Sequence, residues 1–185
     1  MKRQPDPTGE ALPDQVASIR IRAPIERVWR EITKIGRVQK AVYNTILETS
    51  LIPGEPLRYY NPGKSRVFVM GDIVECEPPT VFSHTYWFTT WRTDKPTLVT
   101  WRLAQDGDEC IVTVTHSGWT KEHKEYGSTG KGWAQILALL KALVEGGDVP
   151  ARTHLAYALM GWFSFLLPER TLTTHVDAHS KSETR

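Results

Sequence analysis

Residues 132–145, GWAQILALLKALVE, decide the fold, because their large apolar side chains recur at every third or fourth position. This spacing places them on a single stripe of an α-helix. Ser128 or Thr129 can cap the start of the helix, and Gly146 and Gly147 tolerate the left-handed conformation that commonly ends one. Such a stripe must be buried against another apolar surface. It consists of Trp133, Ile136, Leu137, Leu140 and Val144.

Strands and turns upstream supply the surface that this helix can cover. Residues 15–22 (QVASIRIR) alternate apolar and polar side chains, and later alternating segments are separated by turn signals such as Pro53-Gly54 and Asp106-Gly107. Strands joined by short turns pair antiparallel. An antiparallel sheet with a helix on one face is an α+β architecture. The expected strands, about six or seven, are residues 15–22, 45–50, 57–60, 66–76, 81–89, 97–104 and 109–116.

Two short helices are expected after the first strand. Pro24 suits the first turn of a helix, where no amide partner is lost, and Glu26 favours the positive end of the helix dipole. Apolar residues then follow at helical spacing over residues 25–32. Gly36 interrupts this pattern, and residues 37–43 are expected to form the second short helix.

Four motifs together resemble a known family. In order and spacing they are similar to the SRPBCC, or START-like, superfamily, and closest to the branch named after the activator of the heat-shock protein 90 ATPase. The resemblance covers residues 16–147 and implies the helix-grip fold, a curved antiparallel sheet wrapped around a long C-terminal helix. This fold hosts carriers, cyclases, hydrolases and co-chaperones, so it does not specify an activity. The motifs are APIERVW (residues 23–29), GDIVECEPP (71–79), VTHSGW (114–119) and GW (132–133).

Composition indicates one globular domain of 185 residues. The net charge is +2 and no Lys/Arg-rich run is present, which argues against a nucleic-acid partner. Cys76 and Cys110 are interpreted as two buried thiols in a reducing compartment, with a disulfide as the alternative, so a cytoplasmic location is expected. We expect a disordered lead-in without a signal peptide over residues 1–13, the domain over 14–147, an additional apolar helix over 148–170 and a polar tail over 171–185.

Standard catalytic and metal-binding motifs are missing from the sequence, including Gly-x-Ser-x-Gly, His-Glu-x-x-His and Cys-x-x-Cys. His116 and His123 are the best metal pair, but no third ligand stands at a diagnostic spacing. We therefore expect neither a metal nor a cofactor.

Strand alternation identifies one candidate site. Over residues 81–89, one face carries Phe82, His84, Tyr86 and Phe88, and the more apolar face of each strand should point inward. An apolar cavity with a few polar groups is the usual form of a small-molecule site. The candidate ligand-binding residues are Tyr43, Tyr59, His84, Tyr86, Trp101, His116, Trp133 and Leu137.

These candidates have structural alternatives. The two histidines can instead be hydrogen-bonded residues of the core, and the two tryptophans can simply fill it. Tyr43 and Tyr59 are assigned to the rim of the cavity. Histidine and tyrosine together can also do acid–base chemistry, because histidine titrates near neutral pH.

Residues 155–167, LAYALMGWFSFLL, form an uncharged segment of 13 residues. As a helix it would be roughly 20 Å long, short of the roughly 30 Å hydrocarbon core, so no membrane span is expected. A helix that is apolar all round is usually buried. Packing on its own domain, a homodimer contact through residues 151–167 and binding to a membrane surface are the three interpretations.

Three functions remain open. The first is binding of a hydrophobic small molecule, of lipid, polyketide or aromatic type, in an internal cavity without catalysis. The second is a co-chaperone-like protein interaction, which the resemblance implies. The third is a cyclase or hydrolase that uses His84, Tyr86 or His116.

Overall fold

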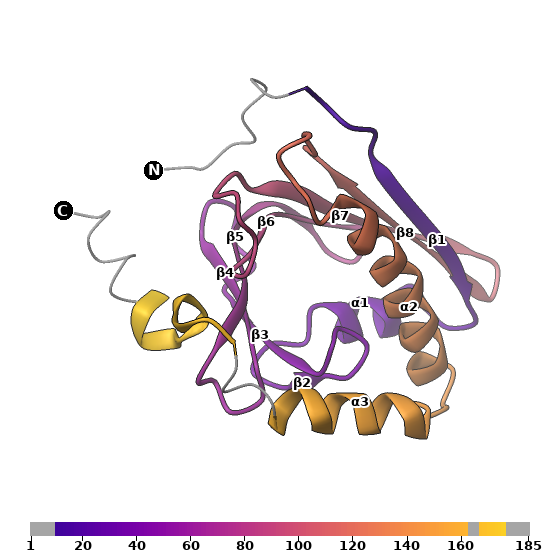
Figure 1. Ribbon diagram of the computed structural model, residues 1–185. Coiled ribbons are helices and arrows are strands. Elements are labelled where there is room, and N and C mark those ends of the chain that lie inside the picture. Colours follow the sequence, from indigo (N-terminus) through magenta and orange to yellow (C-terminus); the bar gives the residue numbers. More distant parts are fainter. Residues whose placement is uncertain (1–9, 163–166, 177–185) are drawn as a thin grey trace.

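The computed structural model describes residues 10–162 and 167–176, and its main element is one curved antiparallel sheet (Figure 1). Eight strands follow the order β1-β8-β7-β6-β5-β4-β3-β2, so the first strand lies beside the last. The strands are β1 (Gln15–Ile21), β2 (Val38–Gln39), β3 (Thr45–Thr49), β4 (Pro56–Tyr60), β5 (Val67–Glu77), β6 (Val81–Phe88), β7 (Thr97–Asp106) and β8 (Glu109–Ser117).

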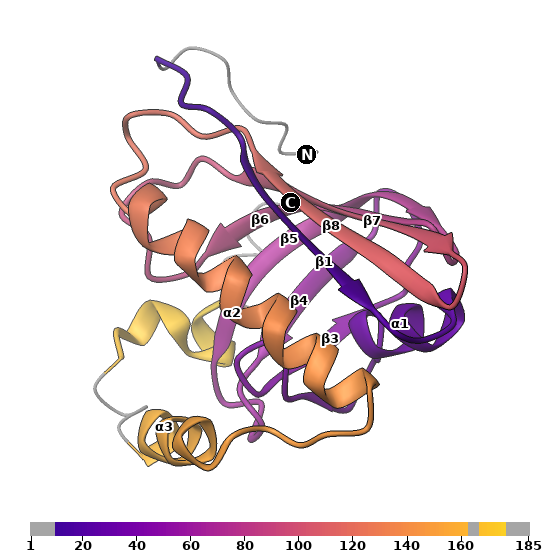
Figure 2. The ribbon, with the colours of Figure 1, turned by 90° about the vertical axis from the view of Figure 1, so that its right-hand side faces the viewer.

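The long helix α2 (Tyr126–Val144) runs along β1, and the sheet curves around one side of it (Figures 1 and 2). Val112 and Val114 of β8 are fully buried in the same cluster as Leu137 and Leu140 of the helix. This arrangement confirms the helix-grip fold predicted from the sequence. The sheet has eight strands rather than six or seven because the two-residue β2 was not predicted.

The segment between β1 and β3 differs from the prediction in its second half. Helix α1 (Ile25–Ile32) forms as expected and buries one face. The helix expected over residues 37–43 is wrong, because the chain forms β2 there and pairs with β3. Tyr43 and Asn44 then turn the chain with φ values of 49° and 58°, in the left-handed region that a right-handed helix cannot use.

Helix α2 begins six residues earlier than Gly132, the predicted start. Ser128 and Thr129 are therefore not caps. Their hydroxyls lie inside the first turn and donate to the Glu125 carbonyl oxygen at 2.9 and 3.0 Å. The apolar stripe remains, but it occupies only the later turns of a 19-residue helix.

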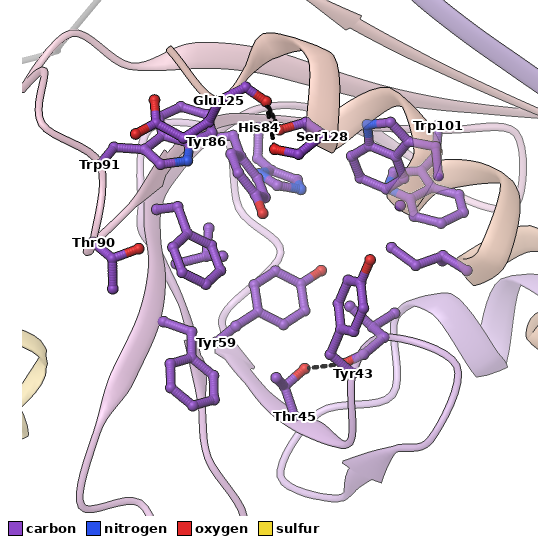
Figure 3. Close-up of a pocket in the computed structure, with 18 of the residues that line it drawn as sticks. Tyr43, Thr45, Tyr59, His84, Tyr86, Thr90, Trp91, Trp101, Glu125 and Ser128 are labelled. Atoms are coloured by element: carbon purple, nitrogen blue, oxygen red, sulfur yellow. Dashed lines mark hydrogen bonds between the residues drawn. The ribbon is translucent and has the colours of Figure 1, made fainter. Parts of the chain in front are cut away.

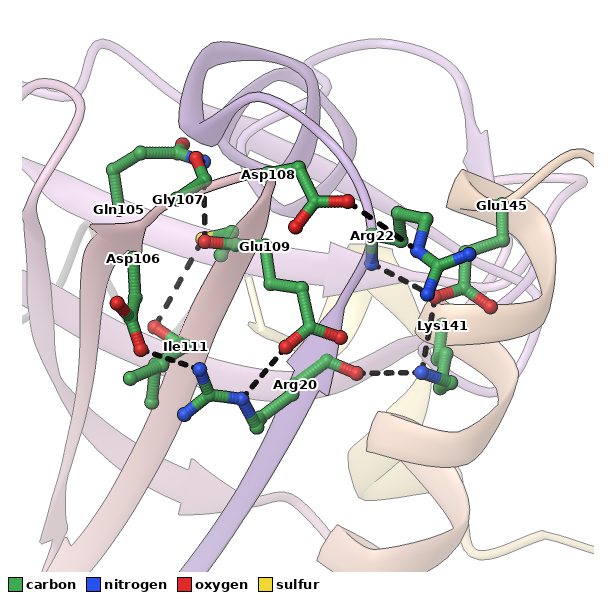
Figure 4. A network of polar contacts seen from close by, with 11 residues as sticks. Arg20, Arg22, Gln105, Asp106, Gly107, Asp108, Glu109, Ile111, Lys141 and Glu145 are labelled. Carbon is green, nitrogen blue, oxygen red and sulfur yellow. Dashed lines mark hydrogen bonds and ion pairs between the residues drawn. The ribbon is translucent and has the colours of Figure 1, made fainter.

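A surface network ties the C-terminal end of α2 to β1 (Figure 4). The Lys141 ammonium donates to the Arg20 carbonyl oxygen at 2.6 Å, and the Arg22 amide donates to the Glu145 carboxylate at 2.8 Å. The Arg20 guanidinium also pairs with Asp106 and Glu109 of the β7–β8 hairpin. Because these pairs are solvent-exposed, they orient the helix end more than they stabilise the fold.

Helix α3 (Ala151–Trp162) packs on its own domain through Thr153 and Tyr157, which are buried one turn apart. Tyr157 is buried, and its hydroxyl donates to the Lys40 carbonyl oxygen at 2.9 Å. Leu155 and Leu159 are exposed, so packing on its own domain does not bury all of the described apolar side chains of this helix. Within the described residues, every helix is too short or too polar to cross a membrane.

Both ends of the described chain are held against the domain more firmly than expected. The Leu12 amide donates to the Trp119 carbonyl oxygen at 2.9 Å, although residues 1–13 were expected to be a disordered lead-in. Residues 171–176 do not form the expected polar tail, because Thr171 and Val176 are buried and Leu172 bridges to Arg66. The predicted lead-in and the predicted tail also include residues 1–9 and 177–185. These two segments lie outside the described residues.

The two cysteines are free thiols on β5 and β8. Cys110 is buried and Cys76 is half-buried. Burial raises the pKa of both thiols. The interpretation as thiols is confirmed over the disulfide.

Candidate functional site

A cavity of about 460 Å³ lies between the sheet and the N-terminal part of α2 (Figure 3). Its wall is mostly apolar, with a few polar groups between the aromatic rings. The volume lies within the range of small-molecule sites, roughly 300–1,000 Å³.

Six of the eight candidate residues line this cavity. They come from elements far apart in the sequence, and the strand residues among them lie on the inward face because side chains alternate along a strand. Register supports this placement, since Trp101 stands opposite Phe82 of β6 and Val114 of β8. The six are Tyr43 before β3, Tyr59 on β4, His84 and Tyr86 on β6, Trp101 on β7 and Trp133 on α2.

His84 is a neutral imidazole in the cavity wall. It is only 1% exposed, and its Nδ1 lies 2.9 Å from the Thr85 carbonyl oxygen, an acceptor. Nδ1 therefore carries the hydrogen, and Nε2 keeps a lone pair that can accept one. Burial lowers the pKa of His84 to about 4.

Three tyrosine hydroxyls share the same space. Figure 3 shows Tyr43, Tyr59 and Tyr86 pointing into the cavity, with no dashed line to any of their hydroxyls. Burial raises the pKa of all three phenols, and Tyr43 and Tyr59 add to the effect on Tyr86. The hydroxyls are therefore protonated at neutral pH and can both donate and accept.

The two tryptophans of the wall differ in how their ring nitrogens are used. The Trp133 Nε1 donates to His116 at 3.0 Å, so this indole is fixed by the core. The Trp101 side chain is only 2% exposed, so water can hardly reach its Nε1. This nitrogen also has no hydrogen-bond partner among the described residues. Leaving such a donor unpaired costs roughly 1–3 kcal/mol, unless a ligand supplies the acceptor.

His116 and Leu137 do not reach the cavity. His116 accepts from Trp133 on one ring nitrogen, and its other nitrogen lies 2.7 Å from the Thr97 hydroxyl, so both nitrogens are satisfied. Tyr86 and Trp91 cover the ring, with centroid distances of 5.0 and 6.4 Å. His116 is thus the hydrogen-bonded core histidine of the alternative interpretation. Leu137 belongs to the filled core one turn beyond Trp133.

Several wall residues were not among the candidates. Phe88 lies on the inward face by the alternation that placed His84 and Tyr86, so the same signal could have found it. Trp91 follows β6 in a turn and Glu125 precedes α2, where neither alternation nor a helical stripe applies. The remaining wall residues are Val42, Thr45, Phe68, Val69, Thr90, Ser128, Thr129, Gly132, Ile136 and Leu167.

The chemistry of the wall is that of a binding site. Within residues 10–162 and 167–176, no group of three or more His, Cys, Asp or Glu side chains could hold a metal ion. Apart from the Glu125 carboxylate, the polar groups among the aromatic residues are neutral donors and acceptors: three phenols, one indole N–H and one imidazole nitrogen.

Known structures share this fold. CalU16 from Micromonospora echinospora is 22% identical with a TM-score of 0.60, over 90% of this chain and 96% of that chain. The Aha1 dimer from Colwellia psychrerythraea is 17% identical with a TM-score of 0.62, over 75% and 100%. DynU16, described as a protein of the dynemicin biosynthetic locus, is 18% identical with a TM-score of 0.61, over 73% and 48%. The curated proteins contain no match.

The family comparison covers the same part of the chain as the helix-grip domain. The family model described as "Activator of Hsp90 ATPase homolog 1-like protein" matches residues 22–145, from the end of β1 to the end of α2. This match includes all four sequence motifs and the whole of α1. The chain therefore belongs to the family of activator of Hsp90 ATPase homolog 1-like proteins, within the START-like superfamily.

Proposed function

We propose that this protein binds a hydrophobic small molecule, of lipid, polyketide or aromatic type, in the cavity between α2 and the sheet. One observation carries the proposal: the cavity wall is mostly apolar, yet two buried polar atoms of its residues, the Trp101 Nε1 and the Glu125 Oε2, have no hydrogen-bond partner among the described residues. An apolar ligand would bury the wall, at roughly 25 cal/mol for each Å² of apolar surface removed from water. A ligand oxygen would accept from the Trp101 Nε1–H, and a ligand N–H or O–H would donate to the Glu125 carboxylate.

The ionisation of His84, Tyr59 and Tyr86 supports a ligand whose main body, where it contacts these residues, is neutral. His84 remains uncharged at neutral pH because its pKa is about 4, and the raised pKa values of Tyr59 and Tyr86 keep both phenols protonated. The His84 Nε2 suits a hydroxyl or phenol of the ligand, and the Trp101 Nε1–H suits a carbonyl or ether oxygen. The many aromatic rings of the wall favour a flat ligand.

The same ionisation argues for binding over turnover. A histidine with a pKa near 4 is a weak base at neutral pH, and a phenol with a raised pKa is a weak acid. His116, the third candidate for acid–base work, is held in the core by Thr97 and Trp133. A cyclase or hydrolase mechanism through these residues is therefore disfavoured.

The test compares a filled and an unfilled cavity. Val69 lines the cavity from β5, whereas Val74 of the same strand is 50% exposed and does not line it. Binding of a fluorescent aromatic probe such as 1-naphthol should fall at least about tenfold in Val69→Trp and stay unchanged in Val74→Trp, the matched control. Native mass spectrometry of the freshly purified protein should show a co-purified small molecule. Equal probe binding by both variants would refute the proposal.

A homodimer through residues 151–167 stays a prediction. Leu155 and Leu159 of α3 are 62% and 44% exposed, and the Colwellia psychrerythraea relative is described as a dimer. The same mass spectrum should contain a dimer that Leu155→Glu dissociates. A monomeric wild-type protein at micromolar concentration would contradict it.

The family description favours a second candidate, a co-chaperone-like interaction with Hsp90. Adding the protein to an Hsp90 ATPase assay tests this candidate directly. An increased ATPase rate that survives Val69→Trp would assign the activity to the surface of the domain rather than to its cavity.

A further inference from the structure

We propose that the ligand carries a positively charged amine or a comparable N–H donor, and that Glu125 binds it at one end of the cavity. The inference rests on the proposed function and adds a chemical requirement to it. Among the described residues that line the cavity, Glu125 alone has an acidic side chain. The other polar groups of the wall are neutral, so this carboxylate sets the charge that the ligand meets.

The Glu125 carboxylate is not used by the fold. Its Oε2 is buried and has no hydrogen-bond partner among the described residues. No basic side chain in the described part of the chain lies within 4.0 Å of the carboxylate as an ion pair. An acidic residue at the start of a helix often caps the free amides with its side chain, but Glu125 makes no such bond. Only its backbone carbonyl is used, as the acceptor for Ser128 and Thr129.

Aromatic rings surround the same end of the cavity. Tyr86 and Trp91 both line it, with their ring centroids 5.6 Å apart. Figure 3 shows Glu125 at the end of the cavity where Tyr86 and Trp91 lie, away from Tyr43 and Thr45. A cation is attracted to the faces of such rings as well as to a carboxylate. An ammonium group next to the carboxylate and over the face of one of these rings would therefore gain both interactions.

The cost of leaving the carboxylate unpaired points in the same direction. A buried oxygen that carries charge and lacks a partner is more expensive than a neutral one. A charge-assisted hydrogen bond from an ammonium removes that cost and is about twice as strong as a neutral one. The rest of such a ligand can still be apolar, because the remaining wall is aromatic and aliphatic.

The experiment uses two probes of nearly the same shape, 1-naphthylmethylamine and 1-naphthalenemethanol, and measures both dissociation constants by fluorescence. We expect the wild-type protein to bind the amine about tenfold more tightly than the alcohol. In Glu125→Gln the preference should disappear, with alcohol binding changed less than about twofold. Glu122→Gln is the matched control, because Glu122 pairs with Lys95 on the surface and does not line the cavity.

The outcomes separate this inference from the proposed function. If both probes bind equally to the wild-type protein, or if Glu125→Gln keeps the preference, the inference is overturned while ligand binding stands. If Glu122→Gln loses the preference to the same extent, the effect is one of overall charge and the assignment to Glu125 is overturned. If neither probe binds, the proposed function fails together with the inference.

Discussion

The two halves of α2 cover the same sheet in different ways. In the C-terminal half, Leu140 and Val144 are buried in a filled core, and Lys141 ties the helix end to β1. In the N-terminal half, Gly132 and Trp133 line a cavity of about 460 Å³. One helix thus closes the core at one end and leaves it hollow at the other.

The difference lies in the side chains that face each half. Aliphatic residues fill the closed end and have no polar atoms to satisfy. Rigid aromatic residues line the hollow end, and groups such as the Trp101 Nε1 remain unpaired there. Unsatisfied polar groups destabilise a fold, so natural proteins tolerate them mainly where function requires them. The closed end therefore stabilises the domain, and the hollow end is available for a ligand.

The largest expected effect is at the closed end. Leu140 is 2% exposed, and Leu140→Ala should lower the free energy of unfolding by about 4 kcal/mol, because it removes buried methyl groups and leaves a void. Urea denaturation measures this loss. Affinity for 1-naphthol should remain within about twofold wherever the variant is still folded. A loss below about 1 kcal/mol would mean that this end is not closely packed.

The next largest effect is a loss of folding stability at acidic pH, and it arises from a residue of the hollow end. The folded pKa of His84 is about 4, below the ordinary value of 6.5, so the unfolded chain takes up the proton first. The stability from neutral His84 is thus present above about pH 6.5 and is lost as the pH falls towards 4. The loss from this residue is roughly 3 kcal/mol. Burial also lowers the pKa of His116, which adds to the effect.

Urea denaturation between pH 7 and pH 4 measures this slope. His84→Gln should reduce the dependence of stability on pH, and His116→Gln should also reduce it, because a glutamine side chain takes up no proton in this range. A slope that is unchanged in both variants would place the acid-sensitive groups elsewhere in the molecule.

The closed end could be predicted from the sequence and the hollow end only in part. The helical stripe containing Leu140 and the alternation along β6, β7 and β8 specify which faces point inward, and these are the faces that form the core. Alternation gives the direction of a side chain and not its depth. His116 points inward as predicted, yet Trp91 from a neighbouring turn covers it. The presence of empty space depends on such tertiary contacts, which have no signal in a single sequence.

Local irregularities account for the remaining errors. Residues 37–43 have a composition that suits a helix, but pairing of β2 with β3 and the left-handed turn at Tyr43 and Asn44 override it. Glu125 lies before α2 in a stretch without periodicity, so no pattern connected it with the cavity. The acidic side chain at a helix start would have suggested a cap, which the structure does not contain.

A smaller effect distinguishes a hydroxyl that the fold uses from one that it does not. The Tyr157 hydroxyl donates to the Lys40 carbonyl oxygen, so Tyr157→Phe should cost about 1 kcal/mol of stability without affecting probe affinity. Tyr86→Phe should cost less than about 0.5 kcal/mol, because its hydroxyl faces the cavity. Tyr86→Phe should nevertheless weaken 1-naphthol binding several-fold, because the ligand loses a hydrogen-bond partner. Denaturation and fluorescence titration of both variants check the pair, and equal effects of the two would remove the distinction.

The smallest expected effect concerns Tyr43, which lines the hollow end, is 36% exposed and was predicted to lie at the rim of the cavity. A methyl group added at Gly132 would lie 2.6 Å from the Tyr43 hydroxyl, so Gly132→Ala must push this ring away from the helix. Alanine favours the helix over glycine by up to about 1 kcal/mol, and this gain offsets the cost of moving the Tyr43 ring. The free energy of unfolding should therefore change by less than about 1 kcal/mol. If Tyr43 limits entry to the cavity, as its predicted rim position implies, 1-naphthol should associate and dissociate several-fold faster in stopped-flow measurements, with little change in affinity.

Gly127→Ala provides the control for this last variant. It lies in the first turn of the same helix, and a methyl group there meets no atom within 4 Å among the described residues. It should therefore alter helix propensity without altering the kinetics. If the two variants show the same probe kinetics, Tyr43 does not limit entry to the cavity. The access route must then run elsewhere along the wall, for example past Ser128, which is exposed and also lines the cavity.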